Sequence, residues 1–149
     1  MDQAIRSKIL DMLEHRIMTI ATLRPDGWPQ ATAVGYASEG LTLYFLCGRD
    51  SQKAANLAHD DRVSLTIDHD SADIMKISGL SMAAHAKPVT DRAEGARIRG
   101  LLFSRYREQP AMALPLPEPE DVAIFRVEPT IVSVLNYSEG FGHTDLVTC

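Results

Sequence analysis

Three short apolar runs separated by turn signals constrain the fold more than any other feature of this sequence. The runs cover residues 18–23, 31–36 and 41–46. Gly27 and Gly40 each end a polar turn between two runs, and glycine adopts the positive φ of tight turns more readily than other residues. The pattern predicts a three-stranded antiparallel meander, followed by a helix that begins near Ser51.

Further helices and strands are predicted along the rest of the chain. Helices are expected over about 3–15, from Ser51 to about 60, and over 91–107. Strands are expected at 63–67, 74–77, 82–86, 123–127 and 130–135. Residues 74–77 and 82–86 also fit one long strand bent at Gly79. Four prolines within 109–119 predict an extended loop, and the tail after residue 135 shows no periodicity.

The order of these elements favours one fold class. Six to eight short antiparallel strands with interspersed helices fit a mainly β protein, a small barrel with its helices outside. Strict alternation of strands and helices is absent, so a doubly wound parallel sheet is the less favoured alternative. With 149 residues and 45% apolar content, we expect one compact domain over residues 1–149.

Composition and charge indicate which cellular compartment and which class of partner to expect. The net charge of −5 argues against general nucleic-acid binding, which usually needs a basic face. No apolar stretch approaches the roughly 18–20 residues of a membrane helix, and the start of the chain lacks the pattern of a secretory signal. The two cysteines have no metal-type or redox-type spacing. We therefore expect a cytoplasmic protein that binds a small molecule or a protein, and neither nucleic acid nor membrane.

The start of the second predicted helix is the best candidate ligand site. Ser51 and Lys53 carry a hydroxyl and an ammonium group that suit phosphate oxygens, and the free amides of a helix N-terminus favour an anion. An ordinary serine cap beside a solvated lysine explains the same residues about as well. The small side chains of residues 32–34 would let a flat ring approach a strand, although packing beneath a helix explains them better.

Other polar residues give weaker signals. Asp68-His69-Asp70 reads as a solvated turn, and because no second cluster of ligand residues accompanies it, no metal site is predicted. His85 is interpreted as a core or interface histidine, and Cys47 as a small buried residue rather than a reactive thiol. No serine lies in a glycine-flanked elbow, so a catalytic triad is not supported.

The tail contains an aromatic residue and a histidine between glycines, in Gly140-Phe141-Gly142-His143. Glycines allow tight bending, the phenylalanine offers apolar cover and the histidine offers a hydrogen bond. We expect this segment to fold over the ligand cleft, in particular that of a neighbouring subunit. A frayed end is the alternative.

Taken together, the motifs resemble those of the pyridoxamine 5′-phosphate oxidase-like split-barrel flavoproteins. The resemblance rests on residues 19–23, 26–29, 32–34, 43–45, 51–57, 62–65 and 77–79 and on the strand pair around Glu128-Pro129. It implies an antiparallel split β-barrel that forms a homodimer, with FMN bound in clefts at the subunit interface. It also implies a flavin-dependent oxidoreductase that acts on a small molecule.

Carried over by position, the resemblance implies eight cofactor-binding residues. Thr32, Ala33 and Val34 would line the cofactor, Leu46 and Cys47 would stand beside the phosphate, and Ser51, Gln52 and Lys53 would bind the phosphate. The tail described above adds His143, which would reach the flavin edge or the substrate.

This chain departs from the family's oxidases at positions that matter for activity. Those oxidases carry arginine at the positions of Thr32 and Gln52, and a C-terminal Arg-x-His motif that this chain lacks. The departures argue against oxidation of pyridoxamine phosphate. Alternatives are a non-catalytic flavin-binding or stress-response module, a deazaflavin-dependent reductase, and a haem-binding relative with His85 or His143 as axial ligand.

Overall fold

A computed structural model describes residues 1–105 and 118–149 of the chain. Its strands are β1 (Ile17–Leu23), β2 (Pro29–Gly35), β3 (Ala37–Glu39), β4 (Thr42–Gly48), β5 (Arg62–His69), β6 (Ser78–Pro88), β7 (Val122–Asn136) and β8 (Thr144–Thr148). Its α-helices are α1 (Gln3–Met12), α2 (Gln52–His59) and α3 (Arg92–Ser104), and its 3₁₀ turns are η1 (Ile74–Lys76), η2 (Pro119–Asp121) and η3 (Tyr137–Glu139).

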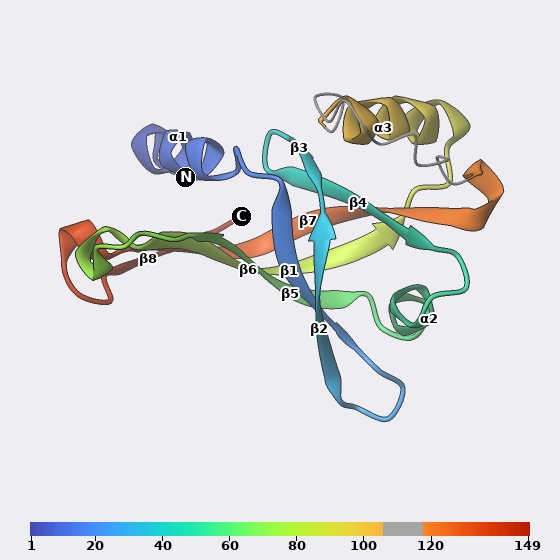
Figure 1. Cartoon of the computed structure of the whole chain (residues 1–149), viewed down its shortest axis with the longest axis horizontal. Coiled ribbons are helices and arrows are strands. Elements are labelled where there is room, and N and C mark those ends of the chain that lie inside the picture. Colours follow the sequence, from blue (N-terminus) through green and yellow to red (C-terminus); the bar gives the residue numbers. More distant parts are fainter. Residues whose placement is uncertain (106–117) are drawn as a thin grey trace.

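The strands form one eight-stranded sheet in the order β2-β1-β5-β6-β7-β4-β3, with β8 paired to β7. Every pairing is antiparallel. The two ends of this order, β2 and β3, are consecutive in the chain, and β2 also contacts β4. The sheet therefore curls into a split barrel with the helices outside it (Figure 1), which confirms the predicted fold class.

The predicted three-stranded meander is wrong. β1 and β2 pair as expected, but β2 has no ladder with β4. The turn at Gly40 joins β4 only to the short β3, and β4 pairs along its length with β7. Local turn signals predict a hairpin correctly, but long-range packing decides which distant strand completes the sheet.

The two strands predicted around Glu128-Pro129 are one continuous strand, β7. Proline has no N–H for the ladder, and the structure accommodates it at a register shift opposite Ala83 and Ala84 of β6. Thr130 Oγ1 donates to the Ala83 carbonyl at 3.1 Å, so a side chain replaces part of the ladder. The bulge expected at Gly79 of β6 therefore lies instead in β7, at Thr130, opposite Ala83 and Ala84.

Gly79 is instead a point of close approach. A Cβ at this position would lie 3.0 Å from the carbonyl oxygen of Ile67 on the neighbouring strand. This contact is tighter than ordinary van der Waals packing, so a larger residue would push β5 and β6 apart.

Two further segments differ from expectation. Residues 74–76 form η1 rather than a strand, because the Asp73 carboxylate accepts a hydrogen bond from Met75 N–H at 3.0 Å and closes the turn. The tail is more ordered than its sequence suggests, since it ends in β8, which pairs with residues 131–135 of β7. The predicted loop over 109–119 lies outside the described residues up to 117.

The predicted helices are confirmed, with local caps at their starts. Asp2, Ser51 and Asp91 each accept a hydrogen bond from an amide in the first helical turn. No helix within the described ranges is long and apolar enough to cross a membrane.

The barrel interior is filled by alternate residues of the strands, with Ile9 and Leu13 from the α1 end packed against them. A smaller apolar cluster joins α3 to the outside of the barrel through Tyr44, Ile98 and Ile124. The interior cluster is the main core, and the α3 cluster is separate from it.

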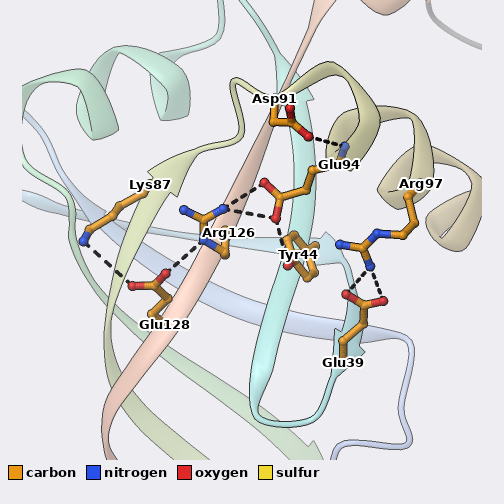
Figure 2. A network of polar contacts seen from close by, with 8 residues as sticks. All are labelled: Glu39, Tyr44, Lys87, Asp91, Glu94, Arg97, Arg126 and Glu128. Atoms are coloured by element: carbon orange, nitrogen blue, oxygen red, sulfur yellow. Dashed lines mark hydrogen bonds and ion pairs between the residues drawn. The ribbon is translucent and has the colours of Figure 1, made fainter.

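A polar network holds α3 beside this second cluster (Figure 2). Arg126 Nη1 of β7 lies 2.9 Å from Glu94 Oε1 of α3, and Arg126 Nε lies 2.9 Å from Glu128 Oε1. Tyr44 Oη donates to Glu94 Oε2 at 3.4 Å, and burial raises the pKa of this hydroxyl. Contacts Arg97–Glu39 and Lys87–Glu128 extend the network at its rim.

Candidate functional site

The candidate site begins where β4 ends and α2 begins. Ser51 Oγ accepts a hydrogen bond from Ala54 N–H at 3.2 Å and donates one to the Gly48 carbonyl at 2.6 Å. The predicted serine cap is therefore confirmed, and the hydroxyl already has partners for both roles. The amides of the first turn have no intrahelical acceptor. An anion here would be bound mainly by those amides and by Lys53.

Lys53 is a partly buried cation on the first turn of α2. Among residues 1–105 and 118–149, no carboxylate forms an ion pair with it. Loss of hydration lowers the pKa of Lys53, and the nearby Cys47 acts in the opposite direction. A partly desolvated ammonium without a counter-charge is unfavourable. A bound anion would remove this cost.

Cys47 is buried beside Lys53 at the end of β4. Burial raises the pKa of its thiol, more than the contacts with Ser51 and Lys53 lower it. The neutral thiol supports its interpretation as a small buried residue. Leu46, one residue earlier, packs instead against the α3 cluster. Successive side chains of a strand point to opposite faces, so these two residues do not present their side chains to one site.

Strand β2 supplies the second part of the candidate site. Thr32 and Val34 are partly buried opposite Ile20 and Met18 of β1, whereas Ala33 points outward and is exposed. Thr32 Oγ1 is buried, and in the described part of the chain it has no hydrogen-bond partner. Buried hydroxyls are nearly always paired in native proteins. Because this hydroxyl has almost no accessible surface, a ligand with a polar edge would pair with it only after a local rearrangement of β2.

A buried side chain connects the two parts. Asn56 of α2 is fully buried, and its Nδ2 donates to Thr22 Oγ1 at 2.9 Å and to Gln30 Oε1 at 3.2 Å. Its Oδ1 accepts a hydrogen bond from Gln52 Nε2 at 2.8 Å. The network thus joins the start of α2 to β1 and β2. Gln52, predicted as a phosphate ligand, contributes to this network.

Sequence reasoning missed Asn56, Thr22 and Gln30. The available signal is an asparagine inside a short helix, where its propensity is low. Thr22 and Gln30 face each other across the β1–β2 hairpin. That pairing becomes visible only when the hairpin register is known.

His143 lies apart from these residues. Its Nε2 is 3.2 Å from Glu139 Oε2 and 3.3 Å from Asp145 Oδ2, in the turn before β8. Figure 1 places this turn and α2 at opposite ends of the long axis of the molecule. Lys8 Nζ also lies 3.2 Å from Glu139 Oε2, so a cation already balances part of the acidic charge. The structure does not bring His143 to Ser51 within one chain.

Two other histidines lie on strands β5 and β6. His69 differs from its predicted setting, and for His85 the interface setting stays a prediction. His69 ends β5 rather than lying in a turn, and its Nε2 is 2.8 Å from the Met12 carbonyl oxygen. His85 is not a core residue, because its side chain is 42% exposed. Its Nδ1 lies 2.8 Å from Asp61 Oδ1, which leaves Nε2 directed away from that pair.

Comparison with known proteins gives the family. The family model described as pyridoxamine 5′-phosphate oxidase matches residues 1–136. The chain belongs to this family. Among known proteins, general stress protein 26 of Bacillus subtilis (strain 168) is 22% identical over 138 residues, covering 89% of this chain and 96% of that protein.

Solved structures similar to this pyridoxamine 5′-phosphate oxidase family member include proteins with different ligands in their names. A haem-binding protein from Mycobacterium smegmatis matches with a TM-score of 0.75 and 22% identity, over 99% of this chain and 59% of that one. An FAD-binding protein from Mesorhizobium loti matches with a TM-score of 0.69 and 17% identity, over 90% of this chain and 94% of that one. At these identities the likeness shows the fold alone.

Proposed function

We propose that this chain is an FMN-binding, flavin-dependent oxidoreductase acting on a small molecule. The observation that carries the proposal is Lys53, a partly buried cation without a carboxylate partner among the described residues, at a helix N-terminus. A phosphate group would supply the counter-charge there. Membership of the pyridoxamine 5′-phosphate oxidase family supports a phosphorylated flavin as its source.

The buried hydroxyl of Thr32 on β2 would pair with the other end of the same ligand after a local rearrangement of that strand. When bound, the flavin ring supplies the redox chemistry. The chain's own residues would bind and orient the ring: Thr32 Oγ1 would pair with a polar ring atom, and the backbone of residues 33–34 would contact its edge. Lys53 would hold the phosphate, and Cys47 would pack beside it as a neutral thiol.

We also propose that the functional unit is a homodimer with cofactor clefts between the subunits. The family resemblance supports this arrangement, and so do large apolar side chains on the surface of the isolated chain, since Trp28 and Phe141 are 73% and 74% exposed. Because the turn before β8, which carries His143, lies far from α2 of its own chain (Figure 1), His143 would reach a cofactor only in the partner. His143→Ala would then weaken FMN binding without unfolding the barrel.

The test is the visible absorption spectrum of the purified protein, followed by titration with FMN. We expect a yellow protein, or an apoprotein that takes up FMN and quenches its fluorescence. Turnover with NADH or NADPH and an electron acceptor would then separate an oxidoreductase from a non-catalytic flavin-binding protein. A colourless protein that takes up no FMN at micromolar concentration would contradict the proposal.

Haem binding is a second candidate, favoured by the geometry of His85. Asp61 holds Nδ1 of this imidazole, which is the usual arrangement for a histidine that binds iron through Nε2. His85 lines a groove of about 320 Å³ on the outer face of the sheet together with Ala21, Leu23 and Ala83. A Soret band that appears on haem titration and is lost in His85→Ala would support this candidate, and an unchanged spectrum in that variant would exclude His85.

A further inference from the structure

We infer that Asn56 is a positioning residue that sets the spacing between the two halves of the cofactor site. The inference rests on the proposed function, in which α2 holds the phosphate and β2 holds the ring. Asn56 lies on α2, and its side chain donates hydrogen bonds to β1 and β2. It touches neither proposed end of the ligand itself.

The hydrogen-bonding capacity of Asn56 is almost completely used. Both Nδ2 hydrogens have acceptors, Thr22 Oγ1 on β1 and Gln30 Oε1 on β2, and Oδ1 has the Gln52 amide as donor. Two of these contacts leave α2, one to β1 and one to β2, and the third stays within the helix. The side chain therefore ties α2 to both strands of the β1–β2 hairpin, and Gln52 holds the amide in the orientation that makes both contacts.

A buried asparagine needs an explanation beyond packing. Its amide has low helix propensity and costs free energy to bury, whereas an apolar residue of similar size would fill the same space. Neighbouring Leu57 shows that the same helix packs apolar side chains into the barrel. Asn56 adds directional hydrogen bonds, which specify the placement of α2 more closely than apolar contacts do.

Two members of the network are close in sequence to the two residues proposed to bind the ligand. Gln52 is next to Lys53 on the first turn of α2, and Gln30 is two residues before Thr32 on the same face of β2. A shift of α2 relative to β2 would move Lys53 away from the position that suits a phosphate while the ring stays on β2. A ligand with two linked ends loses affinity when both cannot engage together.

The experiment compares FMN with riboflavin, which has the same ring but no phosphate. Affinities are measured by fluorescence quenching for the full-length wild type and for Asn56→Ala. We expect the preference of the wild type for FMN over riboflavin to fall about ten-fold in Asn56→Ala, while riboflavin affinity stays nearly constant. Gln30→Ala, which removes only the contact with β2, should show a smaller fall and retain the fold.

Tyr36→Phe is the matched control for stability. It removes a buried hydrogen bond, from Tyr36 Oη to the Leu13 carbonyl at 2.7 Å, at the α1 end of the barrel. It should lower the urea midpoint but leave the FMN-to-riboflavin ratio at the wild-type value. If Asn56→Ala does not fold, Gln30→Ala decides the question.

The outcomes separate the inference from the proposed function. A wild type that binds neither flavin would refute the flavin proposal, and the role of Asn56 with it. A wild type that prefers FMN, together with variants that keep the full preference despite reduced stability, would overturn only the positioning role.

Discussion

At the scale of single residues, the candidate site is defined by two polar side chains that lack a partner among the described residues. Lys53 lacks a counter-charge and Thr32 Oγ1 lacks a hydrogen bond within the described residues. Each is unfavourable by itself in a folded protein. Asn56 ties α2, which carries Lys53, to β2, which carries Thr32, and this supports one ligand for both.

Replacing Lys53 tests the phosphate end. Lys53→Ala removes a charge-assisted hydrogen bond of ~1.5–3 kcal/mol, so FMN affinity should fall by roughly ten- to a hundred-fold. The barrel should remain folded, because this lysine has no carboxylate partner among residues 1–105 and 118–149. Fluorescence-quenching titration measures the change, with Lys87→Ala as the control, since Lys87 is half-exposed and pairs with Glu128 of β7. Unchanged affinity would place the phosphate elsewhere.

The pH dependence of FMN binding tests the same residue independently. Burial lowers the pKa of Lys53 below its usual 10.5 in the free protein, and a phosphate would raise it again. FMN therefore binds the protonated form more tightly. Affinity should be constant below the pKa of the free protein and should decrease as pH rises through it.

Lys53→Arg is the control for this pH effect, because its guanidinium stays charged throughout the range. The affinity of Lys53→Arg for FMN should change with pH only through titration of the flavin itself. An identical pH profile for wild type and Lys53→Arg would show that Lys53 is not the titrating group.

At the scale of elements, α3 is held by a polar network as well as by its small apolar cluster. Glu94 accepts from both Arg126 and Tyr44, and its side chain is only 21% exposed. Partly buried charged pairs contribute more than exposed ones, and removal of one partner leaves the other unsatisfied. The network therefore fixes α3 against β4 and β7.

Glu94→Ala should lower the free energy of unfolding by about 1–2 kcal/mol. Urea denaturation with an unchanged m-value measures this loss. Arg62→Ala is the comparison, since its side chain is 70% exposed and pairs with Asp60, two residues earlier in the chain, and we expect no measurable change. Equal midpoints for the two variants would mean that α3 is held by apolar contacts alone.

At the scale of the whole molecule, the exposed aromatic residues predict association. Trp28 is the only tryptophan of the chain and lies at the turn between β1 and β2. Its 73% exposure in the isolated chain is high for so large a side chain. A surface of this kind suits the dimer proposed above.

Sedimentation equilibrium at micromolar concentration should therefore give a dimer. If the β1–β2 turn lies in the interface, Trp28 emission should shift to the red and become quenchable by iodide on dilution to the monomer. A dimer whose Trp28 emission does not respond to dilution would place the interface on another face. A monomer at micromolar concentration would contradict the dimer itself.

Local chemistry in the sequence determined the helix starts and the alternation of most strands. A cap needs only one side chain and an amide two or three residues away, so Asp2, Ser51 and Asp91 could be identified from the sequence alone. The helix start at Ser51 and the small side chains of β2 could be predicted for the same reason, because both features depend on neighbours along the chain.

Only the tertiary structure decided which distant elements meet. β4 pairs with β7 rather than with β2. β7 continues through Pro129 because its pairing with β6 shifts register there. The role of Asn56 likewise depends on Thr22 and Gln30, which are separated from it by 34 and 26 residues. Hydrogen bonds over such separations follow from the packed geometry, and no pattern of nearby residues encodes them.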